Sequence, residues 1–167
     1  RLEADLTVTK LADDKFFVVV TDTMVRHAET WMKRNIPDGA HAFVTDVTSG
    51  YGQLNVQGPR SRELLQRVLD PRCDLSNEAF PFMACGEVAL RNGEPARLFR
   101  ISFSGELAYE IAVPGHRGDA LIRTLHDAGQ DLGVVPYGLE ALNVLRVEKG
   151  HVVGSELNGQ TTAHDLG

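Results

Sequence analysis

The chain has 167 residues, enough for one domain with a hydrophobic core or for two small ones. Hydrophobic residues make up 43% and charged residues 24%, which is ordinary for a soluble globular protein. The formal net charge of −6 argues against a nucleic-acid-binding surface, because phosphates need a basic face.

The two cysteines, Cys73 and Cys85, indicate neither a metal site nor a disulfide framework. Neither lies in a CxxC motif, and no histidine cluster accompanies them. We interpret them as reduced cysteines of a cytoplasmic protein. No apolar run approaches the roughly 20 residues that span a membrane, and no signal peptide opens the chain. The sequence begins directly in a strand pattern without Met, so we expect a piece of a longer protein.

The first part of the chain predicts two hairpins and two helices. Alternation over residues 4–11 and the run "FFVVV" predict strands joined by a polar turn at 12–15. Asp22 or Thr23 caps a helix that runs to about Asn35. The stretches "HAFVTDVTS" and "GQLNVQG" predict a second hairpin around residues 50–52. Pro59 then begins a helix of about ten residues.

The second part continues with a sheet and two helices. Residues 70–84 are irregular and rich in Pro, Asn and Asp, which makes them a candidate boundary. A hairpin is predicted around Asn92-Gly93, and "FRISFSGELAYEIAVPG" at 99–115 continues that sheet through a break at 104–105. Apolar residues at helical spacing predict helices over 116–130 and 137–149, the second ending at Gly150.

This element order predicts an α+β fold. We expect two tandem units, each a mainly antiparallel sheet with helices packed on one face, over residues 1–70 and 71–167. No GxGxxG follows a strand, and neither GxxxxGK[ST] nor GxSxG occurs. Any redox cofactor is therefore expected on another part of the chain or on a partner.

Glu106 is the sharpest candidate for a binding residue. A carboxylate on an apolar hairpin is costly to dehydrate unless a partner binds both oxygens. One such partner is a flat heterocycle with two adjacent N–H donors, such as the edge of a pterin or of guanine. The alternatives are that Glu106 sits at an exposed turn or pairs with Arg100.

Two further residues have both a functional and a structural interpretation. Asp5 precedes the first strand and is either a site carboxylate or an ordinary residue at a strand start. Arg146, at the end of an apolar helix face, either receives a ligand carboxylate or pairs with an acid such as Glu140. None of the six scattered histidines is assigned to chemistry.

Four segments together resemble the folate-binding aminomethyltransferase family, which includes the glycine-cleavage T-protein. They are "ADLTVTKLADDKFFVVVTDT", "LNVQGPRSRELLQ", "FRISFSGELAYEIAVPG" and "PYGLEALNVLRVEKGHVVGSELNGQTTAHDLG". Within the family they are most similar to the carboxy-terminal half of the α subunit of heterotetrameric sarcosine oxidase. The resemblance implies the T-protein fold, with residues 1–70 as the second part of the first folate-binding subdomain. Residues 71–167 would form a second subdomain, truncated at its carboxyl end.

The resemblance also implies roles for particular residues. The family hairpin Gly-Tyr-Thr-Gly-Glu-Asp-Gly matches Phe103 to Glu106, so Glu106 would hold the pterin edge of tetrahydrofolate. The family's key carboxylate falls on Asp5, which would assist one-carbon transfer. The remaining matches concern ligand contacts: Thr21 in place of an Asn, Tyr109 beside the pterin, and Arg146 for one of two helix arginines, the other being Leu142 here.

The function implied is one-carbon transfer from an oxidised N-methyl group to tetrahydrofolate, giving 5,10-methylenetetrahydrofolate. The resemblance places FAD, FMN and NAD only in the full complex, not on this chain, and makes other sarcosine oxidase subunits its partners. Alternatives are a flavin-independent aminomethyltransferase or demethylase of the same superfamily, or a non-catalytic folate-binding or docking module. Relatives that assist iron–sulfur maturation or RNA modification carry Lys-Gly-Cys, where this chain has Lys149-Gly150-His151.

Overall fold

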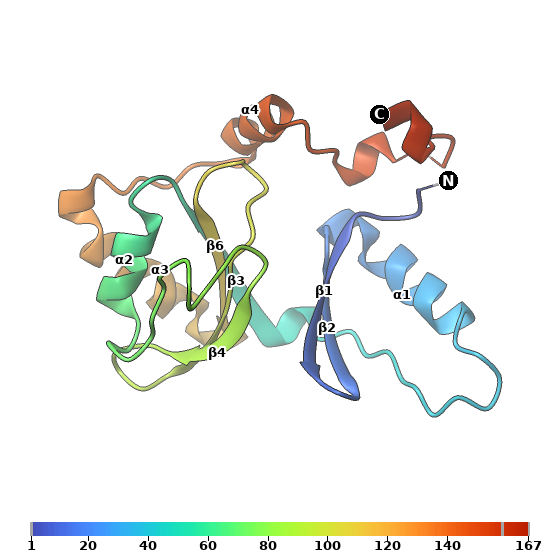
Figure 1. The fold of residues 1–167 in the computed structure, drawn as a ribbon, viewed down its shortest axis with the longest axis horizontal. Coiled ribbons are helices and arrows are strands. Elements are labelled where there is room, and N and C mark those ends of the chain that lie inside the picture. The colour runs from blue at the N-terminus through green and yellow to red at the C-terminus, as the bar shows by residue number, and fades with distance from the viewer. Residues whose placement is uncertain (1, 158, 167) are drawn as a thin grey trace. The chain divides into compact units, whose positions relative to one another are not determined.

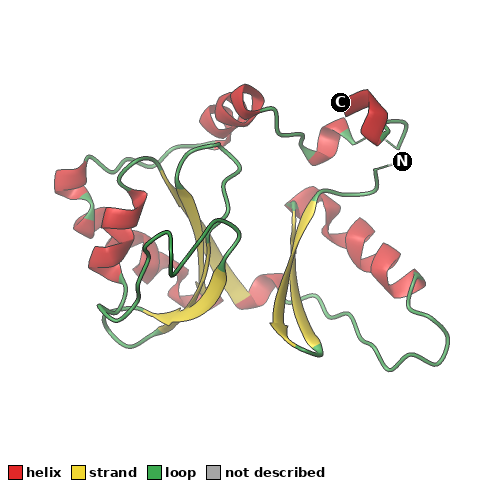
Figure 2. Cartoon of the chain, viewed as in Figure 1, coloured by secondary structure: helices red, strands yellow, loops and turns green. Residues whose placement is uncertain are grey.

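The computed structural model describes residues 2–157 and 159–166 and divides the chain into two compact units (Figures 1 and 2). The hairpin unit consists of Arg1–Asp46 together with His151–Gly167. The sheet unit is the continuous segment Val47–Gly150. Each unit combines antiparallel strands with helices, so the predicted α+β class is confirmed.

The hairpin unit is built on one antiparallel pair of strands. Strand β1 (Leu6–Ala12) pairs with β2 (Lys15–Val20), with Leu6 opposite Val20. The short helix η1 (Asp22–Met24) leads into α1 (Val25–Arg34), which buries Ala28. The predicted first hairpin and first helix are confirmed, but the N-cap of α1 is Met24 and not Asp22 or Thr23. The short helices η5 (Gly154–Glu156) and η6 (Ala163–Leu166) belong to the same unit, where Leu2 N donates to Thr161 O.

The sheet unit contains a four-stranded antiparallel sheet in the order β3-β6-β5-β4. Its strands are β3 (Tyr51–Gln57), β4 (Cys85–Ala89), β5 (Pro95–Phe99) and β6 (Ala108–Pro114). The β4–β5 hairpin confirms the turn predicted at Asn92-Gly93, because Ala89 pairs with Pro95. Strand β6 lies inside the sheet, between β3 and β5.

The second predicted hairpin is wrong. Residues 41–47 form no strand, and the short helix η2 (Thr48–Gly50) precedes β3. Strand β3 pairs instead with β6, from Tyr51 opposite Pro114 to Gln57 opposite Ala108. A strand's alternation fixes which of its faces is buried, but it does not identify a partner far along the chain.

The helices α2 (Ser61–Val68) and α3 (Gly118–Ala128) contact each other and one face of this sheet, confirming the predicted one-sided packing. The short helices η3 (Gly115–Arg117) and η4 (Gln130–Leu132) flank α3, and α4 (Leu139–Lys149) ends at Gly150, whose φ is +83°. The core between sheet and helices includes Val56, Leu64, Leu65, Leu98, Tyr109, Ile111, Val113, Leu121 and Leu125.

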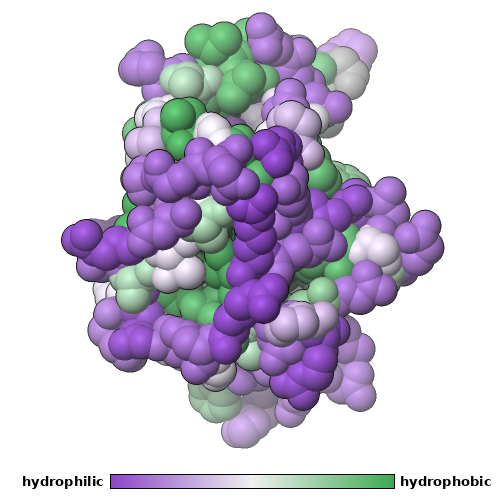
Figure 3. Space-filling model, turned by 90° about the vertical axis from the view of Figure 1, so that its left-hand side faces the viewer, coloured by the Kyte–Doolittle hydropathy of each residue, from purple (hydrophilic) through white to green (hydrophobic). Residues whose placement is uncertain are grey.

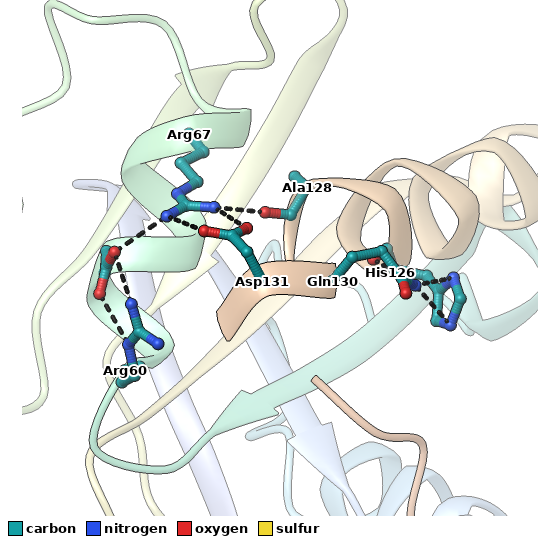
Figure 4. A network of polar contacts seen from close by, with 7 residues as sticks. Arg60, Arg67, His126, Ala128, Gln130 and Asp131 are labelled. Carbon is teal, nitrogen blue, oxygen red and sulfur yellow. Dashed lines mark hydrogen bonds and ion pairs between the residues drawn. The ribbon is translucent and has the colours of Figure 1, made fainter. Parts of the chain in front are cut away.

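The outer surface of these helices is polar. Arg67 on α2 donates to the carbonyl of Ala128 at 2.9 Å and to Asp131 at 3.0 Å (Figure 4). Arg67 also donates to Glu63, and Glu63 accepts a second hydrogen bond from Arg60. The Arg67 guanidinium lowers the pKa of the Asp131 carboxyl. Hydrophilic residues predominate on the side of the molecule where α2 lies (Figure 3). These charges are solvated, so the ion pairs contribute little to stability.

The division into units differs from the predicted one. The expected boundary between residues 70 and 71 falls inside the sheet unit, because Leu69 bridges Leu90 and Asp70 N donates to Ala89 O at 2.9 Å. The irregular segment after α2 therefore packs with the sheet, and its Leu75 is buried in the core. In the described part of the chain, no helix is long and apolar enough to cross a membrane.

Candidate functional site

The loop between β5 and β6 carries the motif on which the sequence analysis focused. Hydrogen bonds hold both of its ends: Arg100 N donates to Ala84 O at 2.8 Å, and Leu107 O accepts from Gly58 N and Ser61 Oγ. Gly105 turns the loop with φ of +85°, a conformation that side chains disfavour. The loop is therefore a fixed feature at one end of the sheet.

Glu106 lies on this loop with an exposed side chain. Its backbone is anchored, since Ser102 Oγ donates to Glu106 O at 2.6 Å and Glu106 N donates to Ser104 Oγ at 3.3 Å. Among the described residues the carboxylate has no hydrogen bond or ion pair, and Arg100 instead donates to the carbonyl of Phe80 at 2.7 Å. The premise that Glu106 is dehydrated by apolar neighbours is wrong, because the turn projects it into water.

The dehydrated carboxylate of this hairpin is Glu110. It lies on β6, between Tyr109 and Ile111, whose side chains enter the core under α2 and α3. Because side chains alternate along a strand, Glu110 points to the opposite face of the sheet. Glu110 is half-buried, and the neighbours on either side along this face of β6 are the buried, small Ala108 and Ala112. We call this surface the second face of the sheet. By register it carries Tyr51, Gln53, Asn55, Cys85, Glu87, Arg97, Phe99, Ala108, Glu110 and Ala112.

One neutral group stabilises this carboxylate. Gln53 Nε2 donates to Glu110 Oε2 at 2.7 Å from the adjacent strand β3. Burial raises the pKa of Glu110, and the hydrogen bond from Gln53 partly offsets that rise. A ligand donor that reached the second Glu110 oxygen would lower the free energy further.

The raised pKa makes a prediction about stability. A carboxyl with a folded-state pKa above its unfolded value favours folding at low pH, and this contribution is lost as pH rises through the folded pKa. Replacing Glu110 by Gln removes this pH-dependent contribution. We therefore expect the loss of stability caused by Glu110→Gln to be smaller at pH 7 than at pH 4. Urea midpoints at the two pH values measure this. An equal difference at both would contradict the raised pKa, and Glu78→Gln, an exposed acid of the same unit, is the control.

Tyr109 is in the core rather than at a ligand surface. Its side chain is fully buried; Phe80 stacks beside it with ring centroids 6.5 Å apart, and Arg62 Nε donates to its hydroxyl at 3.0 Å. Because both the ring and its polar end already have protein partners, a pterin has no access to it. Sequence alternation alone predicted Tyr109 correctly as a strand residue, but stacking on a ligand is not supported.

The other predicted residues of the sheet unit lie around the loop. Phe103 is half-buried within it, and Arg146 is half-buried on α4. A Cβ at Gly105 would lie 2.9 Å from Lys149 Cδ, so the last turn of α4 packs against the loop. Lys149 thus belongs to the surroundings of the 104–106 turn.

Asp5 and Thr21 belong to the hairpin unit. Leu6 pairs with Val20, so Asp5, directly before β1, and Thr21, directly after β2, are neighbours at the open end of the hairpin. Both are exposed, and Thr21 O accepts from Met24 N at 2.9 Å. A Cβ at Gly154 would lie 3.1 Å from the Thr21 methyl group, so the second segment of the unit passes beside this end.

Sequence reasoning missed Glu110, although a signal was available. In "ELAYEIAVP" the strand's outward positions are Ala108, Glu110 and Ala112, so the carboxylate stands between two small residues on one face. No group of three or more His, Cys, Asp or Glu side chains within residues 2–157 and 159–166 is arranged to hold a metal ion.

Comparison with known proteins gives a consistent family. The sequence profile described as "GCVT N-terminal domain" matches residues 1–167. The chain is 41% identical over 168 residues to "Sarcosine oxidase subunit alpha" of Rhizobium meliloti (strain 1021), covering 98% of this chain and 17% of that protein. It is 30% identical over 169 residues to "Dimethylglycine dehydrogenase, mitochondrial" of Homo sapiens, covering 100% of this chain and 19% of that protein.

A solved structure has a related fold. A chain of the heterotetrameric sarcosine oxidase from Corynebacterium sp. U-96, in complex with pyrrole 2-carboxylate, superposes with a TM-score of 0.60 at 17% identity. The superposition covers 81% of this chain and 65% of that one. The chain spans less than a fifth of the length of the curated relatives it matches.

Proposed function

Because the chain belongs to the family of the GCVT N-terminal domain, we propose that it binds tetrahydrofolate and loads it with a one-carbon unit, giving 5,10-methylenetetrahydrofolate. The observation that carries the proposal is the family match along all of residues 1–167. The similarity to a sarcosine oxidase α subunit supports a role as one domain of an enzyme of that type.

Glu110 is the carboxylate to which we assign the pterin, in preference to Glu106. A reduced pterin presents an amino group and a ring N–H side by side, and an ionised carboxylate accepts both. Burial raises the pKa of Glu110, because its charged form is poorly hydrated. A ligand that donates to this carboxylate would therefore offset a dehydration cost. Glu106, the residue implied by resemblance, remains the alternative.

Asp5 is proposed to act in the transfer itself. Formaldehyde condenses with the two secondary amines of tetrahydrofolate: two nitrogen–carbon bonds form, and the carbonyl oxygen leaves as water together with the two N–H hydrogens. An exposed carboxylate such as Asp5 would accept a proton from the attacking amine and return it to the departing hydroxyl, or stabilise the cationic intermediate by charge. Thr21, its neighbour at the open end of the hairpin, is proposed as a weaker ligand contact.

The one-carbon unit must come from an oxidation carried out elsewhere. In an enzyme of the sarcosine oxidase type, FAD, FMN and NAD would lie outside this chain, and the other subunits would be its partners. A cytoplasmic location is part of this proposal. Holding tetrahydrofolate close to the site where the one-carbon unit is released would replace a bimolecular encounter with a reaction inside one protein.

An Asp5→Asn substitution in the full-length protein separates transfer from oxidation. We expect sarcosine oxidation to stay within about twofold, while 5,10-methylenetetrahydrofolate formation falls by roughly 100-fold, the usual contribution of a general base. Semicarbazide in the assay removes free formaldehyde, so that spontaneous condensation does not contribute. Asp14→Asn, an exposed acid at the turn of the same hairpin, is the matched control. Unchanged methylenetetrahydrofolate output would exclude Asp5 from the reaction.

A further inference from the structure

The Glu110 carboxylate is held through only one of its two oxygens. Gln53 Nε2 on β3 donates to Glu110 Oε2 at 2.7 Å, and Oε1 accepts no hydrogen bond from any residue that the structure describes. Burial disfavours the charged form of Glu110, and the bond from Gln53 favours it, so the pKa of this carboxyl reflects two opposing influences. The state of Glu110 therefore depends on one neighbouring side chain.

That side chain is the diagonal neighbour of Glu110 and not the residue directly opposite. In the β3–β6 pair, Asn55 lies opposite Glu110, and Gln53 lies opposite Ala112. Diagonal neighbours are roughly 7–8 Å apart, a separation that two long side chains can bridge. Because Glu110 bonds to Gln53, its side chain leans along β6 toward Ala112. Asn55, although nearer by register, does not bond to Glu110.

The other titratable groups of the second face leave this carboxylate without a counter-ion. By register they are Tyr51, Cys85, Glu87 and Arg97. Arg97 Nη2 lies 3.3 Å from Glu87 Oε1, and its guanidinium carbon lies 5.7 Å from the ring centroid of Tyr51. The partner of Glu110 is thus a neutral amide, which stabilises the carboxylate without cancelling its charge. A ligand donor does not have to displace a cation.

We propose that Gln53 is a positioning residue for Glu110: it holds the carboxylate by Oε2 in one orientation, in which Oε1 is left for a ligand donor. The inference rests on the proposed folate function, in which Glu110 accepts two N–H groups of the pterin. A carboxylate oxygen has two lone pairs, so Oε2 can keep its bond to Gln53 while it receives the ligand. Without Gln53 the Glu110 side chain would have to be ordered by the ligand itself, at a cost in entropy.

Calorimetric titration of the full-length protein with 5-formyltetrahydrofolate, a stable reduced folate, measures the effect on binding. Gln53→Met keeps the length of the side chain and removes the donor, and we expect affinity at pH 7 to fall about tenfold. Because loss of the donor raises the pKa of Glu110, the difference from the unsubstituted protein should grow as the pH is lowered. Gln66→Met, the same substitution at an exposed position of α2, should have no effect.

Chemical labelling reports the protonation of Glu110 without any ligand. A carbodiimide with an amine nucleophile amidates carboxyl groups at a rate that follows their protonated fraction, and mass spectrometry of the peptide that contains Glu110 gives the midpoint against pH. We expect Gln53→Met to move this midpoint to higher pH, because the bond from Gln53 lowers the pKa of Glu110. Asn55→Leu removes the carboxamide opposite Glu110 and should leave the midpoint unchanged.

The two measurements together decide the proposal. A loss of affinity with an unmoved midpoint would mean that Gln53 acts on the ligand or on the strand, and a moved midpoint with unchanged affinity would mean that its bond does not serve binding. Either result would overturn the positioning role. If the unsubstituted protein does not bind 5-formyltetrahydrofolate, the proposed folate function fails. The labelling midpoint still measures the Gln53 bond in that case, and an unmoved midpoint would overturn the inference there as well.

Discussion

Glu110→Gln is expected to weaken tetrahydrofolate binding by about 100-fold, or about 2.7 kcal/mol, when measured by calorimetric titration of the full-length protein. A glutamine presents one acceptor and one N–H₂ group, so one of the two ligand donors would face another donor. The fold should survive, because Gln53 Nε2, which now donates to Glu110 at 2.7 Å, can donate equally well to a glutamine oxygen.

Glu106→Gln is the matched control four residues earlier. Its carboxylate is exposed and is not bonded to any described side chain, so we expect tetrahydrofolate affinity to change less than about threefold. The reverse pattern, with a large loss for Glu106→Gln and none for Glu110→Gln, would assign the pterin to the residue implied by family resemblance. Circular dichroism of both variants establishes that the comparison is between folded proteins.

Tyr109→Ala is expected to have the largest effect on stability, about 3–5 kcal/mol off the free energy of unfolding. The substitution empties a fully buried site in β6, removes the ring that stacks beside Phe80, and leaves Arg62 without the hydroxyl to which it donates at 3.0 Å. Urea denaturation monitored by far-ultraviolet circular dichroism measures the loss.

Tyr109→Phe separates packing from hydrogen bonding at the same position. The ring stays in place and only the hydroxyl that accepts from Arg62 is lost, so we expect a cost of about 1 kcal/mol. Tetrahydrofolate affinity should stay within about twofold. A loss of affinity without a loss of stability would place Tyr109 in the ligand site and contradict its assignment to the core.

Local patterns in the sequence were sufficient for most elements. The run of β-branched residues and the polar turn predicted β1 and β2, and Asn92-Gly93 predicted the turn between β4 and β5. The helices followed from apolar spacing. Gly150 was predicted to end the last helix, and it does so in the left-handed conformation with φ of +83°. In each case the information lies within a few residues of the element that it specifies.

Long-range pairing was not accessible in the same way. Strand β3 could pair with any apolar strand of compatible register, and the neighbouring segment 41–49 looked suitable, yet β6 is the partner. The unit boundary failed for a related reason. Leu69 bridges Leu90 across the irregular residues after α2, so a stretch rich in turn residues lies within one packed unit.

The candidate site illustrates the difference between residue type and environment. The sequence analysis singled out Glu106, but the sequence does not reveal that Gly105 turns Glu106 into water while the pleat of β6 directs Glu110 toward the second face. Burial decides which of two nearby carboxylates carries a dehydration cost, and burial depends on the whole sheet.

A crystal structure of the full-length protein with 5-formyltetrahydrofolate would test the central claim most directly. We expect the pterin to lie on the second face of the sheet, with its amino group and adjacent ring N–H each within about 3 Å of a Glu110 oxygen. A pterin bound at another surface, with Glu110 still bonded only to Gln53, would contradict it.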